Sequence, residues 1–424
     1  MSTTVATTAT SNPPDRLFDF YTTMDRKGRR TFWACAGGFA MDAMDFMVYP
    51  LVIGTLISLW QIDAKTAGGI ATVTLWSSAI GGWCAGYLAD RIGRVRTMQI
   101  TILAFSLGSL LSAGAQDAFQ LTVARGLLGF GFGGEAAVAA VALSEVVGAR
   151  YRGRAMGFYT ASYAVGWAVA VVLQAAFFAA LPTDVAWRVQ FAIGALPALL
   201  IFFIRRHVEE PALSAAQRDA SGPKPSILHI FAPSNLTSTL TGWLLTTGAQ
   251  GGFFSLMIWM PQFLRGERKI SIIGSLPYLL VVISGAFVGY VTGGWLADRF
   301  GRRFVFIVCA ICASALAYGY THVPFSDAAM LVLGFPLGFF ASAYYSAVLP
   351  FLNELFPTNV RGSGVGFTYN AGRAVGGLFP FLVGVVSAML PLSDAISLFA
   401  VISYSLMLLV ALLMTETKGL SLKS

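Results

Sequence analysis

Charged residues are scarce in this chain of 424 residues: Asp, Glu, Lys and Arg make up 11%, whereas apolar types make up 56%. Soluble domains carry about 25% charged residues, so this composition excludes a compact fold with a water-exposed surface. A helix that spans the hydrocarbon core needs roughly 20 apolar residues, or about 35 with its connection. The length therefore predicts about twelve membrane-spanning helices.

Cysteine and histidine are rare as well. The four cysteines, Cys35, Cys84, Cys309 and Cys312, lie in or beside apolar segments, which excludes a disulfide scaffold. Cys309 and Cys312 form C-x-x-C inside an apolar run, where we interpret them as packing residues rather than as redox or metal groups. The three histidines lie in loops or at span edges, and H-E-x-x-H and G-x-S-x-G are absent. An intramembrane enzyme is therefore disfavoured, and no metal site is expected.

Basic residues are in excess, with a formal net charge of +8, but they form no patch that would indicate a nucleic-acid partner. They fall in short clusters between the apolar stretches. Lys and Arg concentrate in the N-terminal segment, the even-numbered loops and the C-terminus, which places both termini in the cytoplasm. The seventh loop is the exception, with Arg265, Arg268 and Lys269. It is either a solvated loop or a basic vestibule that attracts anions.

The predicted architecture is an all-α membrane protein with twelve transmembrane helices in two six-helix halves. We expect a disordered cytoplasmic tail at 1–30, an N-terminal bundle at 31–204, a cytoplasmic central loop at 205–233, a C-terminal bundle at 234–414 and a second cytoplasmic tail at 415–424. The expected spans are 31–59, 67–89, 95–115, 119–146, 155–181, 187–204, 234–264, 271–296, 304–321, 328–353, 364–390 and 394–414.

An internal repeat relates the two halves. GYLADRIGRVR at 86–96 returns as GWLADRFGRRF at 294–304, so that Asp298 follows Asp90 by 208 positions. Further along, Glu145, Arg152 and Gly153 recur as Glu354, Arg361 and Gly362. Six spans per repeat make both halves enter the membrane in the same direction. Such parallel halves place a substrate site between them near the midplane.

The repeated motif G-[YW]-L-A-D-R-x-G-R, after the second and eighth spans, resembles the loop signature of the major facilitator superfamily over nearly the whole chain. That resemblance implies alternating access, with a cytoplasmic latch that closes while the cavity faces outward. From the residues alone, a carboxylate at a helix C-terminus needs compensating cations, and static interfacial anchoring is the alternative. The residues concerned are Asp90, Arg91, Arg94, Glu145, Asp298, Arg299, Arg302 and Glu354.

A few ionisable residues lie inside the spans, where each charge costs at least about 2.5–3.5 kcal/mol. The helical rise puts Asp45 of the first span and Arg125 of the fourth at one level, with Asp42 one turn away. We expect Arg125 to hold one carboxylate ionised while the other exchanges a proton. A static buried salt bridge is the alternative. Glu135 is either a proton relay or a structural hydrogen-bonding group.

Arg373 lies near the middle of the eleventh span, and that span contains no acidic residue. Its planar donor fork fits a substrate carboxylate. Tyr369 and Asn370 precede it by one helical turn and would share an anion-binding face, unless an acidic residue of another helix pairs with the arginine. We assign substrate binding to Arg125, Arg373, Tyr369 and Asn370, and proton coupling to Asp42, Asp45 and Glu135.

Further motifs resemble particular families of the superfamily. D-x-x-D in the first span and R-x-L-x-G-x-G-x-G-G in the fourth are similar to aromatic acid:proton symporters. G-G-E in the fourth span and G-F-T-Y-N in the eleventh are similar to sialate and monocarboxylate:proton symporters. The resemblance implies a monomeric importer of an organic carboxylate in a bacterial inner membrane, driven by the proton gradient without a cofactor. A proton-driven exporter of drugs or metabolites is the alternative.

Overall fold

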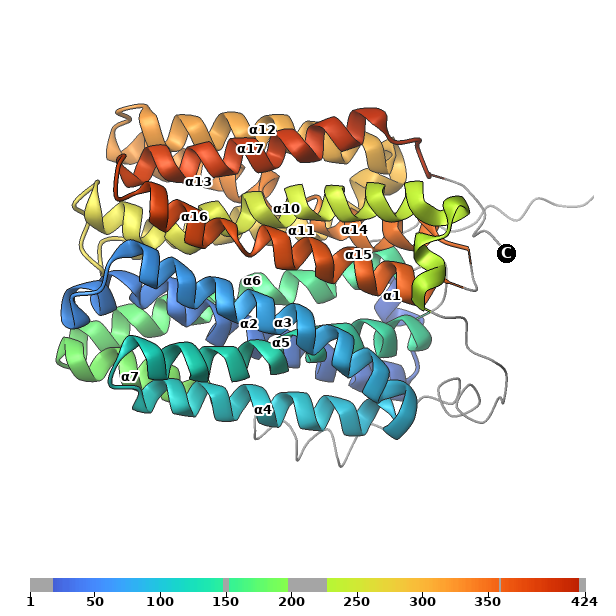
Figure 1. Cartoon of the computed structure of the whole chain (residues 1–424), viewed down its shortest axis with the longest axis horizontal. Coiled ribbons are helices and arrows are strands. Elements are labelled where there is room, and N and C mark those ends of the chain that lie inside the picture. Colours follow the sequence, from blue (N-terminus) through green and yellow to red (C-terminus); the bar gives the residue numbers. More distant parts are fainter. Residues whose placement is uncertain (1–17, 148–151, 197–226, 358–359, 419–424) are drawn as a thin grey trace, which may run out of the picture.

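The computed structural model describes residues 18–147, 152–196, 227–357 and 360–418. These parts of the chain are helical and contain no strand. The long helices run nearly parallel, with the N-terminal half, blue to green, alongside the C-terminal half, yellow to red (Figure 1). We call the end of the bundle that carries Gly93 and Gly301 the motif end. The short helix α1 (Asp19–Thr22) lies at this end (Figure 1).

In the part of the N-terminal half that the structure describes, α1 is followed by six further helices. In it α3 and α4 pack on α5, while α2 packs on α6. Their bounds are α2 Arg26–Trp60, α3 Ala64–Ile92, α4 Arg94–Gly114, α5 Ala118–Val146, α6 Arg152–Ala180 and α7 Thr183–Ile193. The second part of the predicted sixth span, 197–204, lies outside the described residues.

The C-terminal half repeats this packing, with α11 on α13, α12 on α17 and α10 on both α15 and α17. A short 3-10 helix, η2 (Ile227–Phe231), precedes it. The helix bounds are α10 Pro233–Gly266, α11 Leu276–Phe300, α12 Arg302–His322, α13 Asp327–Phe340, α14 Tyr345–Leu355, α15 Arg361–Gly376, α16 Phe379–Val386 and α17 Leu392–Leu413.

Membrane-spanning length and hydropathy are found in seven helical stretches of the described chain. These are Arg26–Trp60, Arg96–Gly114, Arg154–Ala180, Leu276–Phe300, Arg302–His322, Asp327–Leu355 and Leu392–Leu413. The long helices α3 and α10 are not among them, because threonines, serines and glycines interrupt their apolar runs. Both helices lie where the two halves meet, and their polar side chains Thr72, Ser78, Thr246 and Thr247 are buried in protein.

The predicted eleventh span is broken into α15 and α16 at Gly377 and Leu378. Pro380, in the first turn of α16, has no N–H to continue the helical ladder. Helix α3 compensates for the break: Thr72 Oγ1 donates to the Gly377 carbonyl at 2.7 Å, and Trp76 Nε1 donates to the Ala374 carbonyl at 2.8 Å. The break is therefore held by the opposite half of the molecule. The predicted tenth span is interrupted too, between α13 and α14.

Residues 18–30 differ from the disordered tail that we expected at 1–30. Within them α1 forms and α2 begins, at Arg26. The Phe20 side chain is 2% exposed, and its ring centroid lies 5.5 Å from that of Phe32 and 5.2 Å from that of Phe158. Aromatic burial therefore orders this segment against α2 and α6. Residues 1–17 lie outside the described part.

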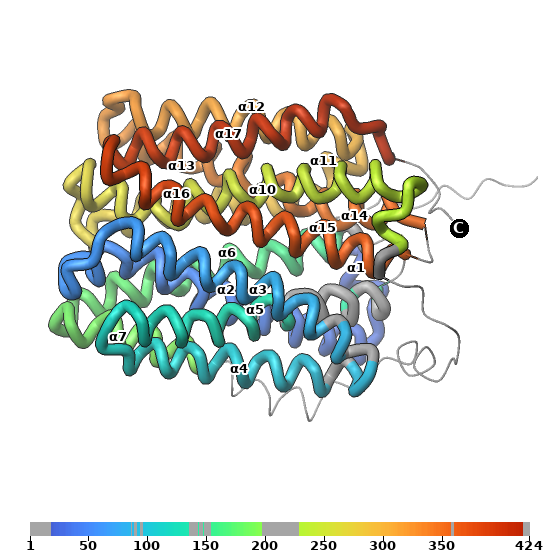
Figure 2. The backbone as a smooth tube through the Cα atoms, viewed as in Figure 1, coloured from blue at the N-terminus to red at the C-terminus, as the bar shows by residue number. Residues whose placement is uncertain are grey.

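The halves meet along α3, which runs beside α15 and α16 (Figure 2). Away from the motif end, Gly68 lies against the carbonyl of Pro380, where a side chain would collide with backbone. Towards the motif end, Trp83 Nε1 donates to the Gly366 carbonyl at 3.4 Å, and its ring stacks on Phe367. Helix α6 also packs on α11 and α2 on α10.

Candidate functional site

Arg373 is 6% exposed and lies in the last turn of α15, just before the break. Its Nε donates to Gln250 Oε1 of α10 and its Nη1 donates to Ser78 Oγ of α3, both at 3.3 Å. Its guanidinium carbon also lies 5.0 Å from the ring centroid of Tyr369 and 5.6 Å from that of Phe132. Among the described side chains no carboxylate lies within 4.0 Å of Arg373, so its described hydrogen-bond partners are neutral groups from both halves.

Three tyrosines that the sequence reasoning missed form a cluster with Tyr369, the aromatic neighbour of this arginine. Tyr163 of α6 is close enough to interact electrostatically with Arg373, Tyr369 and Tyr290 of α11. Tyr345, at the start of α14, interacts in the same way with Tyr163, Tyr290 and Tyr369. The Tyr290 and Tyr345 ring centroids are 6.3 Å apart. Because these residues come from four helices in two halves, no spacing along the chain reveals the group.

The neighbours predicted for Arg373 differ in their surroundings. Tyr369 keeps some accessible surface, as Tyr345 does. Asn370 is 6% exposed and donates through Nδ2 to the Gly366 carbonyl at 3.0 Å. Its amide packs against Gly82 of α3. Tyr369 therefore lies beside the arginine, whereas Asn370 fixes the contact between α15 and α3.

Asp45 and Arg125 lie at the same level, as the helical rise predicts, and both are at most 1% exposed. They interact electrostatically, but no ion pair within 4.0 Å joins them. Arg125 Nη2 donates to the Phe46 carbonyl at 3.3 Å, and the guanidinium packs against the ring of Tyr49. Within the described residues, Arg125 Nε and Nη1 and Asp45 Oδ2 have no hydrogen-bond partner. The expected pair is thus close but not directly bonded.

Asp45 is instead fixed by α4 and the end of α7. Its Oδ1 lies 2.8 Å from Ser109 Oγ, which also lies 2.7 Å from the Phe191 carbonyl oxygen. The carboxyl packs directly against Gly194, where any side chain would collide with it. Asp42 is likewise buried, at 1% exposure. The side chain of Glu135 lies outside the described residues, so its predicted role remains a prediction.

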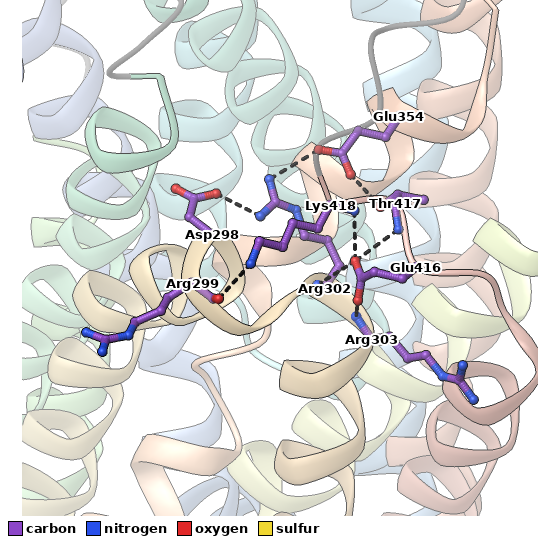
Figure 3. Close-up of polar contacts among 8 residues, drawn as sticks. All are labelled: Asp298, Arg299, Arg302, Arg303, Glu354, Glu416, Thr417 and Lys418. Carbon is purple, nitrogen blue, oxygen red and sulfur yellow. Dashed lines mark hydrogen bonds and ion pairs between the residues drawn. The ribbon is translucent and has the colours of Figure 1, made fainter.

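Three of the predicted latch residues of the C-terminal half, Asp298, Arg302 and Glu354, lie together at the motif end (Figure 3). Arg302 forms ion pairs with Asp298 at 2.7 Å and with Glu354 at 3.2 Å. The Arg299 guanidinium points away from this cluster and lies 5.3 Å from the Trp295 ring centroid. These ion pairs join α11, α12 and α14 of one half rather than crossing between the halves. In the other half Arg91 lies over the Tyr87 ring, and the side chains of Asp90, Arg94 and Glu145 lie outside the described residues.

The segment after α17 adds partners that the sequence reasoning missed. Glu416 accepts the backbone N–H groups of Arg302 and Arg303, at 3.0 Å each, and so caps the N-terminus of α12 (Figure 3). Gly301, at a φ of +101°, brings the carboxylate into reach of these donors. Partial burial alone would raise the pKa of Glu416. Four backbone N–H donors outweigh that effect and lower it below 4.5.

Comparison of the chain with known proteins identifies its family. The model of the Major Facilitator Superfamily matches residues 34–380 and, in a second match, 285–423. The chain belongs to the major facilitator superfamily.

Among its relatives, the "Probable 4-methylmuconolactone transporter" of Cupriavidus pinatubonensis is 36% identical, over 96% of this chain and 95% of that protein. The "Niacin transporter NiaP" of Acinetobacter baylyi is 26% identical, over 92% and 95%. The inward-open structure of the xylose transporter XylE from E. coli superposes with a TM-score of 0.71 at 18% identity, over 92% of this chain and 97% of that one. The protein is therefore a multi-pass membrane transporter with two six-helix halves, and not an enzyme.

Proposed function

We propose that this transporter carries an organic carboxylate together with protons, by alternating access around Arg373. The observation that supports this most directly is a buried arginine between the halves whose described hydrogen bonds reach only neutral side chains, Ser78 and Gln250. A buried guanidinium is costly without an anion. A bidentate carboxylate would supply the missing charge.

A flat, unsaturated or aromatic acid is the favoured substrate class in this proposal. Tyr369 lies beside the arginine and forms one cluster with Tyr163, Tyr290 and Tyr345, and Tyr345 and Tyr369 keep accessible surface. Aromatic faces stack well on planar ligands, and phenolic groups add hydrogen bonds. The relative named as a niacin transporter fits this chemistry, because niacin is an aromatic carboxylate.

Proton coupling is assigned to Asp45, with Asp42 and Glu135 as further carriers. Asp45 is buried near Arg125 without bonding to it. An ionised carboxylate in this position would be drawn to the free N–H groups of Arg125, whereas a neutral one needs no such pair. Arg125 therefore keeps its proposed part in both substrate binding and proton coupling.

The ion pairs of Asp298, Arg302 and Glu354 act as the latch in this proposal. We place both termini in the cytoplasm of a bacterial inner membrane and expect a monomer.

Uptake measurements on intact cells test the proposal. Radiolabelled niacin, benzoate and the non-aromatic acid lactate are offered to cells that express the wild type or Arg373→Ala, with and without a protonophore. We expect accumulation of at least one aromatic acid by the wild type, its collapse with protonophore, and no uptake by Arg373→Ala at equal expression. Accumulation that survives the protonophore would overturn proton coupling. Normal uptake by Arg373→Ala would overturn the carboxylate site.

A further inference from the structure

The hydroxyl of Ser109, on α4, contacts two oxygen atoms and has one hydrogen to share. Its Oγ lies 2.7 Å from the Phe191 carbonyl oxygen and 2.8 Å from Asp45 Oδ1, and Ser109 is 0% exposed. A carbonyl oxygen can only accept a hydrogen bond, whereas a carboxyl oxygen accepts when ionised and donates when protonated. The direction of the second contact therefore depends on whether Asp45 carries a proton.

The end of α7 decides where the Ser109 hydrogen points. Helix α7 ends at Ile193, and Ala195 N donates to the carbonyl of Ala192 rather than to that of Phe191. The Phe191 carbonyl is thus one of the terminal acceptors that a helix leaves without a ladder donor. A buried carbonyl without a donor costs about 1–3 kcal/mol, so it takes the Ser109 hydrogen. The Asp45 contact then requires a hydrogen from the carboxyl group.

We propose that Ser109 is the positioning residue that holds a proton on Asp45 in this conformation, by accepting a hydrogen bond from the neutral carboxyl while it donates to Phe191. This inference rests on the proposed proton coupling and names how the proton is held. The Asp45 oxygen that remains, Oδ2, has no hydrogen-bond partner in the described part of the chain. An unpaired oxygen costs less on a neutral carboxyl group than on a charged carboxylate.

The groups around Asp45 agree with a neutral state. Its own helix contributes Asp42 and Tyr49, and α5 contributes Arg125. From α4 it meets the Ser109 hydroxyl and from the end of α7 the backbone of Gly194. The nearby cation of α7, Arg188, donates instead to the carbonyls of Ala113 and Ala115. Arg125 is therefore the cation near Asp45 among the described residues, and it is not bonded to it.

The arrangement gives Asp45 two alternative partners. The neutral carboxyl bonds to Ser109, and the ionised carboxylate would turn to Arg125, whose Nε and Nη1 have no described acceptor. Proton release would thus exchange a contact between α2 and α4 for one between α2 and α5. The exchange moves one proton from Asp45 to water and changes no covalent bond other than O–H. It links the charge of Asp45 to the packing of α4 and α7.

Infrared difference spectroscopy of the purified full-length protein tests this without a transported ligand. A protonated carboxylic acid has its own C=O stretching band, which disappears on ionisation. We expect a buried band that is missing in Asp45→Asn and that titrates with pH. Ser109→Ala removes the acceptor of the neutral form, so the midpoint of this titration should move to lower pH by about 0.4–1 unit. Ser109→Thr keeps the hydroxyl and should restore the wild-type midpoint.

Ser112→Ala is the matched control, because the Ser112 hydroxyl is equally buried but donates to the Gly108 carbonyl of its own helix. It should leave the midpoint unchanged. An upward shift in Ser109→Ala would overturn the inference, since it would mean that Ser109 donates to an ionised carboxylate. An unchanged midpoint would overturn it too. Niacin uptake by Asp45→Asn is scored separately: normal accumulation there would refute the proposed coupling, whatever the spectra show.

Discussion

The Arg373 guanidinium of α15 donates to the Ser78 hydroxyl of α3, at 3.3 Å, across the boundary between the two halves. The same side chain donates to Gln250 within its own half. A carboxylate that took both N–H groups would replace a bond between the halves with a bond to substrate. In the proposed mechanism, substrate binding and the relative position of the halves are linked through this one arginine.

Arg373→Lys is expected to keep the positive charge and lose the planar fork. The apparent KM for niacin should rise roughly 10- to 150-fold, which corresponds to the loss of one charge-assisted hydrogen bond of about 1.5–3 kcal/mol. Initial uptake rates over a concentration series measure the KM, and the yield of monodisperse protein reports folding.

Arg188→Lys is the matched control for that variant. Arg188 donates to the backbone carbonyls of Ala113 and Ala115, so its replacement should lower stability and leave the KM near the wild-type value. A wild-type KM in well-folded Arg373→Lys would contradict the carboxylate role.

Asp45→Asn is expected to abolish accumulation of niacin against its gradient and to preserve counterflow exchange. The amide cannot exchange a proton, so the step that couples uptake to the gradient is lost while the substrate site stays intact. Proteoliposomes with and without an imposed pH gradient measure both activities. Accumulation equal to the wild type would remove Asp45 from the coupling mechanism and leave Asp42 and Glu135 as the candidates.

The sequence predicted features that depend on periodicity or on the repeat. Helical rise alone put Asp45 and Arg125 at one level, and the repeated motif brought Asp298, Arg302 and Glu354 to one place. Each of these follows from geometry within a helix or from a duplicated pattern.

Other features could not be predicted, because they arise between segments that are distant in the chain. Tyr163, Tyr290 and Tyr345 come from three helices and share no motif. Asp45 meets Ser109 of another helix, and Ser109 in turn contacts the Phe191 carbonyl, which lacks its ladder donor because α7 ends at Ile193. The ordering of Phe20 depends on aromatic packing, which a Thr- and Ser-rich tail composition hides.

Glu416→Gln is expected to weaken the cap of α12 and to lower the free energy of unfolding by about 1 kcal/mol at neutral pH. The pKa of Glu416 is lowered in the folded protein, so its contribution is present above the ordinary value of 4.5 and is lost as the pH falls through the lowered pKa. The difference in Tm between the wild type and the variant should therefore be constant near neutral pH and shrink below about pH 4.5. Thermal unfolding in detergent at several pH values measures it.

Glu267→Gln provides a comparison at the other end of the bundle, where that carboxylate accepts the backbone N–H of Ser393. We expect a smaller loss, since Glu416 accepts four backbone donors. A Tm difference for Glu416→Gln that is independent of pH would show that the charge of the carboxylate does not stabilise the cap.

Glu354→Gln is expected to open the motif end. Arg302 and Glu354 have side chains only 11% and 14% exposed, so their ion pair is poorly screened by water. Asp298, at 56% exposure, is a weaker partner for the same arginine. The latch role predicts that Glu354→Gln shifts the population toward an open motif end more than Asp298→Asn does.

Gly366→Cys reports on that opening, in a chain whose four native cysteines are replaced. Gly366 has room for a side chain, and its carbonyl accepts the hydrogen bond from Trp83 of the other half, so it lies on the boundary at this end. The rate of maleimide labelling at this position should rise in Glu354→Gln and rise less in Asp298→Asn. Labelling of Gly362→Cys, an exposed position on the same helix, should not change. A latch that controls opening must change the accessibility of Gly366→Cys when the latch is weakened. Equal labelling of Gly366→Cys in all three backgrounds, with folding intact, would therefore show that these ion pairs are static anchors within one half.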